Sequence, residues 1–331
     1  MEEINLLAGK IRNGDRAALS KGITLCESDL ALHKSQALSL LDQLYPVTGN
    51  SIRIGVSGIP GAGKSTLIEA LGTYLIDQHQ KRVAVLAIDP SSEQSSGSIL
   101  GDKTRMETLS KREDAFIRPS PTKAQLGGVA QQTQTAILLC EAAAYDIIIV
   151  ETVGVGQSEI MVNHMVDVFL LLQIVGAGDD IQAMKRGVLE WVDMVIFNKA
   201  DHGKETQAKV EAANMSRALA LFPTKHAGWS IPVLSCSAIE KTGIEAIWET
   251  IVSHQLHLNQ QEIFQKQREE QLNNLLYSLE SQVLHAFLTQ HKKIIALRKE
   301  NQQEWQSKER PPFSVLQDFK EQLTKILPEE N

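Results

Sequence analysis

Residues 58–65 read Gly58-Ile59-Pro60-Gly61-Ala62-Gly63-Lys64-Ser65, and Thr66 follows them. The run matches the spacing G-x-x-x-x-G-K-[ST], in which the glycines let backbone N–H groups approach a phosphate closely. Lys64 adds a positive charge, the following helix adds its dipole, and Ser65 offers a hydroxyl to Mg²⁺. The segment therefore predicts a site for a nucleoside triphosphate.

The flanking sequence puts this loop between a strand and a helix. Residues 52–57 are apolar and β-branched, and leucines recur every four residues from 67 to 75. Further apolar segments, each alternating with helical stretches, lie at 83–88, 146–150, 168–172, 194–197 and 232–236. This alternation predicts an α/β fold of the P-loop NTPase type, a mostly parallel sheet covered by helices on both faces. Ligands of such sheets bind beyond the strand C-termini.

Composition and spacing divide the chain into three predicted parts. Residues 1–48 form an N-terminal helical extension, and residues 49–255 form the nucleotide-binding domain. Residues 256–331 contain no glycine and are rich in Gln, Glu, Lys and Leu, which predicts a C-terminal helical arm. The arm carries an apolar stripe at helical spacing. This stripe either packs on the chain's own domain or serves dimerisation. It comprises Leu272, Leu276, Leu279, Val283 and Phe287.

Net charge and composition disfavour several classes of function. A formal charge of −7 and a pI near 5.8 disfavour nucleic-acid binding, and no apolar run is long enough for a membrane span. The acidic start excludes a secretory signal. Cys26, Cys140 and Cys236 are predicted to be free thiols, and the nine histidines show no metal-site spacing. We expect a cytoplasmic protein.

Two motifs further along the chain indicate which base the bound nucleotide carries. Asn198-Lys199-Ala200-Asp201 directly follows an apolar segment. Guanine presents two donors, N1–H and the N2 amine, which the Asp201 carboxylate accepts together, whereas adenine offers a bare lone pair there. Ser237 and Ala238 follow another strand, where a backbone N–H meets the guanine O6. Sites of this kind discriminate by roughly 10⁴-fold or more, so GTP and GDP are the predicted ligands.

Carboxylates that follow strands are candidates for the Mg²⁺ shell. Glu151-Thr-Val-Gly154 stands where many G proteins have Asp-x-x-Gly, and Asp89 and Asp102 are further candidates. Val155 occupies the position of the water-orienting Gln of Ras-like proteins, and valine cannot orient water. Intrinsic hydrolysis is therefore expected to be slow without a partner.

These motifs together resemble one family, the P-loop GTPases of the methylmalonyl-CoA mutase-associated chaperone group. The likeness runs from about residue 15 to 255. Besides the motifs already quoted, matching segments lie at 88–92, 97–103, 126–129, 150–157 and 176–179. Two departures are Glu93-Gln-Ser-Ser-Gly97, where relatives have Pro-x-Thr-Gly-Gly, and His202, where relatives commonly have glycine.

The resemblance implies a GTPase that gates adenosylcobalamin loading, and protection, of a cobalamin-dependent acyl-CoA mutase. It implies that residues 58–66 bind phosphates and that Ser65, Asp89, Asp102 and Glu151 surround Mg²⁺. Asn198, Lys199, Asp201, Ser237 and Ala238 would bind the base. Lys64 and Glu151, with Asp179, Gln182 and Lys185 of a switch segment, would serve catalysis. The family also implies a homodimer through C-terminal helices.

The 176–186 segment also has an ordinary interpretation, a βα loop whose Asp179 and Asp180 favour a helix N-terminus.

Three other functions compete with the mutase chaperone. A metallochaperone-type GTPase would carry a Cys- or His-rich tract, which this sequence lacks. A kinase linked to amino-acid transport would need a further catalytic base, and a scaffold would need no turnover.

Overall fold

The computed structural model describes residues 2–28, 30–88, 106–119, 126–152, 158–176, 186–222, 224–307 and 311–326. Its strands are β1 (Ile52–Gly58), β2 (Val83–Ile88), β3 (Ala115–Arg118), β4 (Ile147–Thr152), β5 (Val168–Ile174), β6 (Met194–Asn198) and β7 (Val233–Ser235). Its first helices are α1 (Glu2–Arg12), α2 (Arg16–Cys26), α3 (Ala31–Leu44), the 3₁₀ turn η1 (Tyr45–Val47), α4 (Lys64–His79), α6 (Glu107–Ser110) and α7 (Leu126–Ala142). The later helices are α8 (Ser158–Asn163), α10 (Arg186–Leu189), α11 (Glu205–Leu219), α12 (Ile244–Gln260), α13 (Ile263–Gln290), α14 (Lys292–Ser307) and α15 (Pro312–Ile326). Among these described helices, none has the length and apolar character needed to cross a membrane.

The seven strands form one parallel sheet in the order β3-β2-β4-β1-β5-β6-β7. The α/β prediction is confirmed, because the apolar segments pair as buried strands. β3 was not predicted, since it has four residues and lies at the sheet edge, where a continuous apolar run is not required. β1 lies at the centre with β4 and β5 on its two sides, so its C-terminal end is flanked by two other strand ends.

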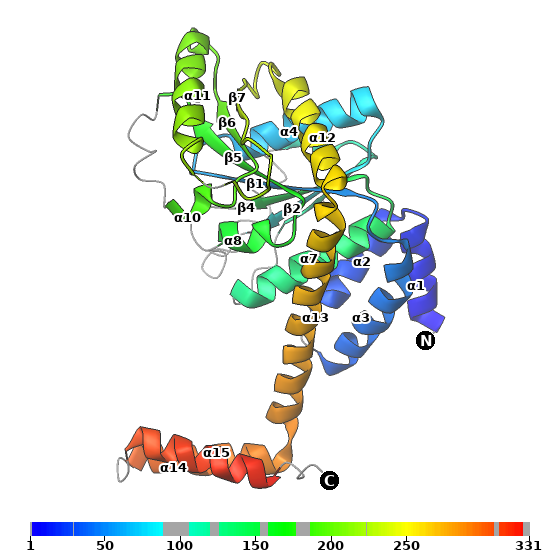
Figure 1. Cartoon of the computed structure of the whole chain (residues 1–331). Helices are drawn as coiled ribbons and strands as arrows, with labels where there is room; N and C mark the ends of the chain where they lie inside the picture. Colours follow the sequence, from blue (N-terminus) through cyan, green and yellow to red (C-terminus); the bar gives the residue numbers. More distant parts are fainter. Residues whose placement is uncertain are drawn as a thin grey trace. The chain divides into compact units, whose positions relative to one another are not determined.

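Helices cover both faces of the sheet (Figure 1). Alternate strand residues point to opposite faces: in β2, Val83 and Val85 join the core beneath α4 and α12, while Ala84 and Leu86 join the core beneath α7 and α11. The predicted N-terminal extension packs into the second of these cores through α1, α2 and α3. Asp15 caps α2 by accepting from the N–H groups of Ala17 and Ala18.

A buried ion network fastens the start of α13 to the sheet. The Arg53 guanidinium donates to both carboxylate oxygens of Glu141 at 2.9 Å. Arg268 of α13 donates to Glu141 at 3.0 Å and to Asp167 at 2.6 Å. Burial alone raises the pKa of Glu141, but Arg53 and Arg268 outweigh it and lower that pKa to about 2. Glu141 therefore stays ionised and paired with the two guanidinium groups at neutral pH.

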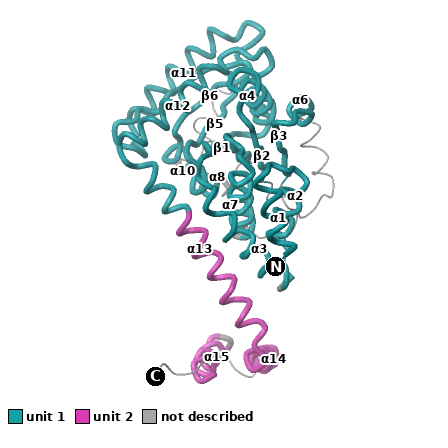
Figure 2. Tube along the Cα trace, turned by 90° about the vertical axis from the view of Figure 1, so that its right-hand side faces the viewer, with its two compact units in different colours: residues 1–271 teal, residues 272–331 magenta. Residues whose placement is uncertain are grey.

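The chain divides into two compact units, residues 1–271 and 272–331 (Figure 2). The first unit holds the whole sheet. Within the second unit α14 packs against α15, burying Ile294, Leu297 and Val315. The three-part division at residues 48 and 255 stays a prediction.

Candidate functional site

The glycine loop lies at the C-terminal end of β1 and leads directly into α4. A Cβ on Gly58 would come within 2.5 Å of the Leu172 carbonyl oxygen, and one on Gly63 within 2.6 Å of Asn198 Nδ2. Gly63 also has φ +84°, in the left-handed region. These two positions exclude a side chain, so the loop lies close against the ends of β5 and β6.

Lys64 is the first residue of α4, and its ammonium lies over the loop. Its Nζ donates to the Gly58 carbonyl at 2.8 Å and lies 3.4 Å from the Ile59 carbonyl. The residue is buried, whereas Pro60, Gly61 and Thr66 are exposed around it. An ammonium at this point places a positive charge inside the loop that the sequence assigns to phosphates.

Ser65 and Glu151 meet between α4 and the end of β4. The Ser65 hydroxyl donates to Glu151 Oε1 at 3.0 Å. Glu151 pairs in register with Val56 of β1, which fixes it beside the loop, and it is buried. Next to it Thr152 Oγ1 lies 3.0 Å from Ser57 Oγ. A hydroxyl and a carboxylate held together are hard oxygen ligands of the kind Mg²⁺ takes, so the donor set fits that ion.

Asn198, the last residue of β6, links the glycine loop to the loop after β7. Its Nδ2 donates to the Ala62 carbonyl at 2.9 Å, and its Oδ1 accepts from the Ala238 N–H at 3.1 Å. Lys199 follows with φ +63°, and its Cε approaches the position of a Cβ on Gly63. The structure thus brings the two predicted base motifs and the phosphate loop to one edge of the sheet.

Asp201 is held by the loop after β7. Ser237 Oγ donates to Asp201 Oδ2 at 2.7 Å and accepts from the Glu240 N–H at 3.1 Å. Because the Glu240 N–H occupies the hydroxyl as an acceptor, the hydroxyl proton is directed at the carboxylate. Burial, together with the Asp201 charge, raises the pKa of Cys236 to about 12, so that neighbouring thiol is not a nucleophile.

Some of the sequence candidates lie outside the described residues. These are Asp89 and Asp102 of the predicted Mg²⁺ shell, the switch residues Asp179, Gln182 and Lys185, and the segment 153–157 with Gly154 and Val155. The described candidates occupy a single region, made of residues 58–66, Glu151, 198–201 and 237–238. Sequence reasoning did not find a buried group formed by Asp193, His226 and His254, because no local motif links these three positions.

The fold and these contacts define a P-loop nucleotide-binding protein. The sequence profile of the family described as methylmalonyl Co-A mutase-associated GTPase MeaB matches residues 19–293. The chain belongs to this family and is a GTPase; the resemblance predicted from its motifs is confirmed.

Curated relatives and a solved structure agree with this assignment. A probable GTPase of Mycobacterium tuberculosis is 48% identical over 270 residues, covering 82% of this chain and 80% of the relative. The GTPase ArgK of Escherichia coli is 47% identical, with 79% of each chain covered. The mouse mitochondrial methylmalonic aciduria type A homolog is 45% identical over 72% of this chain and 60% of its own length. A crystal structure described as LAO/AO transport system kinase superposes with a TM-score of 0.73 at 34% identity, covering 97% of both chains.

Proposed function

We propose that this GTPase gates the loading of adenosylcobalamin into a cobalamin-dependent acyl-CoA mutase and protects that enzyme. The observation that carries the proposal is the family match across residues 19–293, which spans most of the chain. The mouse relative, named for methylmalonic aciduria, supports methylmalonyl-CoA mutase as the client. GTP binding would favour one arrangement of the switch segments, and the client would respond to that difference.

Guanine recognition rests on the contacts around Asn198. Asn198 is bonded to Ala62 and to the Ala238 N–H, so it fixes the loop after β7 against the glycine loop. We expect the base to lie beyond the strand ends, between Asp201 and this loop. Asp201 accepts from guanine N1–H and N2–H, while the Lys199 stem lies over the ring. Ser237, which the resemblance assigns to the base site, positions the Asp201 carboxylate through its hydroxyl.

Phosphate binding falls to residues 58–66, and Lys64 turns from its loop carbonyls toward the ligand. Ser65 and Glu151 would hold Mg²⁺ with Asp89 and Asp102. Held there, the ion would supply positive charge against the negative charge that develops on the transferred phosphoryl group. The protein's own part is to position the phosphates and to keep the positive charge of Lys64 beside them.

Hydrolysis is proposed to be slow until the client acts. Val155 cannot orient water, so acceleration must come from the client or from the switch residues Asp179, Gln182 and Lys185. We place the protein in the cytoplasm, where its three free thiols remain reduced.

Addition of the mutase from the same organism is expected to raise GTP turnover by roughly tenfold or more, since partner-supplied groups reach about 10³–10⁵-fold in other GTPases. Phosphate release is measured with and without the mutase, and an unrelated acyl-CoA enzyme serves as the control. Turnover that the mutase leaves unchanged would remove this client and keep the GTPase.

The C-terminal helices are proposed to join two copies of the chain. Residues 272–331 expose large apolar side chains, among them Leu276, Tyr277, Val283, Leu284, Phe287, Trp305, Phe313 and Leu316. Water-exposed apolar groups in such number are typical of a surface that is covered in the assembly.

Substituting Leu284 and Phe287 with glutamate is expected to convert a dimer into monomers, because two charges would enter an apolar contact. Sedimentation equilibrium measures the mass, which is 36.6 kDa for one chain. Leu221→Glu, at an exposed position of the first unit, is the control. A wild-type protein that stays monomeric at all concentrations would contradict the dimer.

A further inference from the structure

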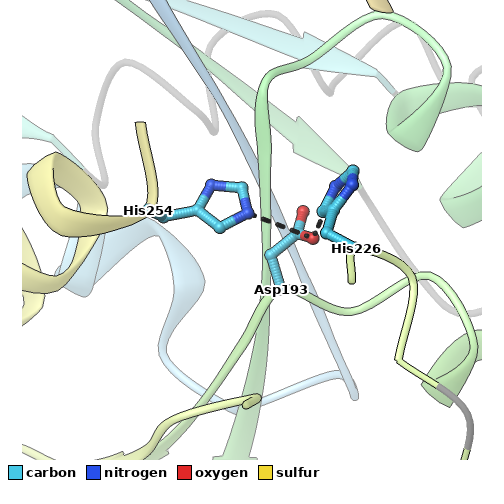
Figure 3. Close-up of side chains that lie close together, drawn as sticks. All are labelled: Asp193, His226 and His254. Carbon is cyan, nitrogen blue, oxygen red and sulfur yellow. Dashed lines mark ion pairs between the residues drawn. The ribbon is translucent and has the colours of Figure 1, made fainter. Parts of the chain in front are cut away.

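Three buried side chains from separate elements converge at one point in the first unit (Figure 3). Asp193 directly precedes β6, His226 lies in the loop before β7, and His254 lies on α12. Asp193 Oδ1 lies 3.5 Å from the Nε2 atoms of both histidines. The side chains are 0%, 8% and 1% exposed, respectively. The group is thus closed to bulk water, with His226 as its most accessible member.

The facing atoms have no hydrogen-bond partners among the described residues. Asp193 Oδ1, His226 Nε2 and His254 Nε2 are all buried without a bond. At 3.5 Å the nitrogen–oxygen separations exceed those of ordinary hydrogen bonds, which are about 2.7–3.2 Å. These atoms contact one another only as long ion pairs, and the lack of ordinary hydrogen bonds costs free energy that a bound group would recover.

The other atoms of Asp193 are fully engaged. Its Oδ2 accepts from the Phe169 N–H at 2.9 Å and from Lys225 Nζ at 2.9 Å. Its carbonyl accepts from Trp229 Nε1 at 2.9 Å. Lys225 is itself held by Asn163 Oδ1 at 2.8 Å. These contacts lock the carboxylate so that Oδ1 alone faces the two imidazoles, as expected of a ligand oriented by its surroundings.

The separations distinguish between ions. A tetrahedral Zn²⁺ with ligands at about 2.0–2.2 Å places neighbouring ligand atoms about 3.3–3.6 Å apart. An octahedral Mg²⁺ at about 2.0–2.1 Å would bring them to about 3.0 Å and prefers oxygen ligands. The two Asp193–histidine separations of 3.5 Å and the two imidazoles therefore fit zinc better than magnesium.

We propose that Asp193, His226 and His254 bind one resident Zn²⁺ ion, with an enclosed water as the fourth ligand. Imidazole nitrogens and carboxylate oxygens are among the ligands that Zn²⁺ takes in proteins, so the donor set fits this ion.

The site ties together three parts of the base-binding half of the sheet. Asp193 leads into β6, which ends at Asn198, and His226 precedes β7, which leads to Ser237 and Ala238. His254 lies on α12, which begins after the loop that carries Ser237 and Ala238. Zinc would therefore stabilise the framework that carries the base motifs, and its burial suits a resident ion rather than a delivered cargo.

The full-length protein is first stripped with a chelator and then loaded with GDP and excess Mg²⁺, so that the phosphate site is filled. Zn²⁺ is titrated by calorimetry, its content is measured by elemental analysis, and Tm is followed. The expected result is one Zn²⁺ per chain and a higher Tm. Absence of stoichiometric binding would overturn the proposal and leave an ordinary buried polar cluster.

Matched variants localise the ion. His226→Gln and His254→Gln should weaken Zn²⁺ binding by more than about 100-fold, because even outer contacts of metal ligands contribute about 10–100-fold. His257→Gln is the control: it lies on the same helix, and its Nε2 is 3.0 Å from the Ala227 carbonyl. Equal affinity in all three variants would refute the site.

A spectroscopic measurement on the wild-type protein tests the site even where the histidine variants fail to fold. Co²⁺ in place of Zn²⁺ absorbs visible light strongly in a tetrahedral site and weakly in an octahedral one. With Mg²⁺ and GDP present, strong absorption that Zn²⁺ displaces supports the proposal. Weak octahedral absorption contradicts it.

Discussion

Replacing Lys64 with alanine is expected to lower GTP turnover by at least about 10²–10³-fold, the loss seen when one charge-stabilising donor is removed from a reacting centre. The ammonium is already inside the loop, where it donates to Gly58 at 2.8 Å, and a short movement carries it to a phosphate. Single-turnover phosphate release measures the chemical step, and binding of a fluorescent GDP analogue measures affinity.

Lys64→Met separates charge from packing in this experiment. Lys64 is only 8% exposed, so alanine also removes a buried stem, whereas methionine retains an apolar chain of similar length. Both variants should lose turnover, and the methionine variant should keep a Tm near the wild-type value. Lys204→Ala, at an exposed position before α11, should change neither property. Turnover retained in Lys64→Met would contradict the role of the charge.

Much of the fold was predictable because buried parallel strands appear as continuous apolar runs. The segments 83–88, 168–172 and 194–197 emerge as β2, β5 and β6 with bounds that differ by at most two residues. β3 escaped because it is short and follows a charged stretch. The C-terminal stripe was visible as a helix, but spacing alone does not tell what covers it, and the structure leaves Leu276, Val283 and Phe287 exposed.

The parts of the candidate site that are contiguous in the sequence were predictable. The parts that the fold assembles from distant positions were not. The phosphate loop and the segment 198–201 are contiguous, so spacing reveals them. The contact that joins them, Asn198 to Ala62, is a consequence of strand order, which sequence spacing does not encode. For the same reason, sequence spacing did not reveal the group of Asp193, His226 and His254. These residues come together only when β6, the loop before β7 and α12 pack.

Asp201→Asn is expected to weaken GTP binding by roughly 10²–10⁴-fold, the sum of two charge-assisted hydrogen bonds of about 1.5–3 kcal/mol each. Xanthosine triphosphate should bind the variant better than the wild-type protein, since xanthine has a carbonyl where guanine has its N2 amine. Competition against a fluorescent GDP analogue measures both affinities.

The surroundings of Asp201 set the orientation that the amide of the Asp201→Asn variant takes. Ser237 Oγ accepts from the Glu240 N–H and must donate its own proton, so the carbonyl of the amide turns to Ser237 and its NH₂ faces the base. Adding Ser237→Ala removes that constraint and should reduce the gain for xanthosine triphosphate. Asp77→Asn, in a surface pair with Arg112, is the matched control and should leave both affinities unchanged. GTP binding unaltered by Asp201→Asn would show that this carboxylate does not contact the base.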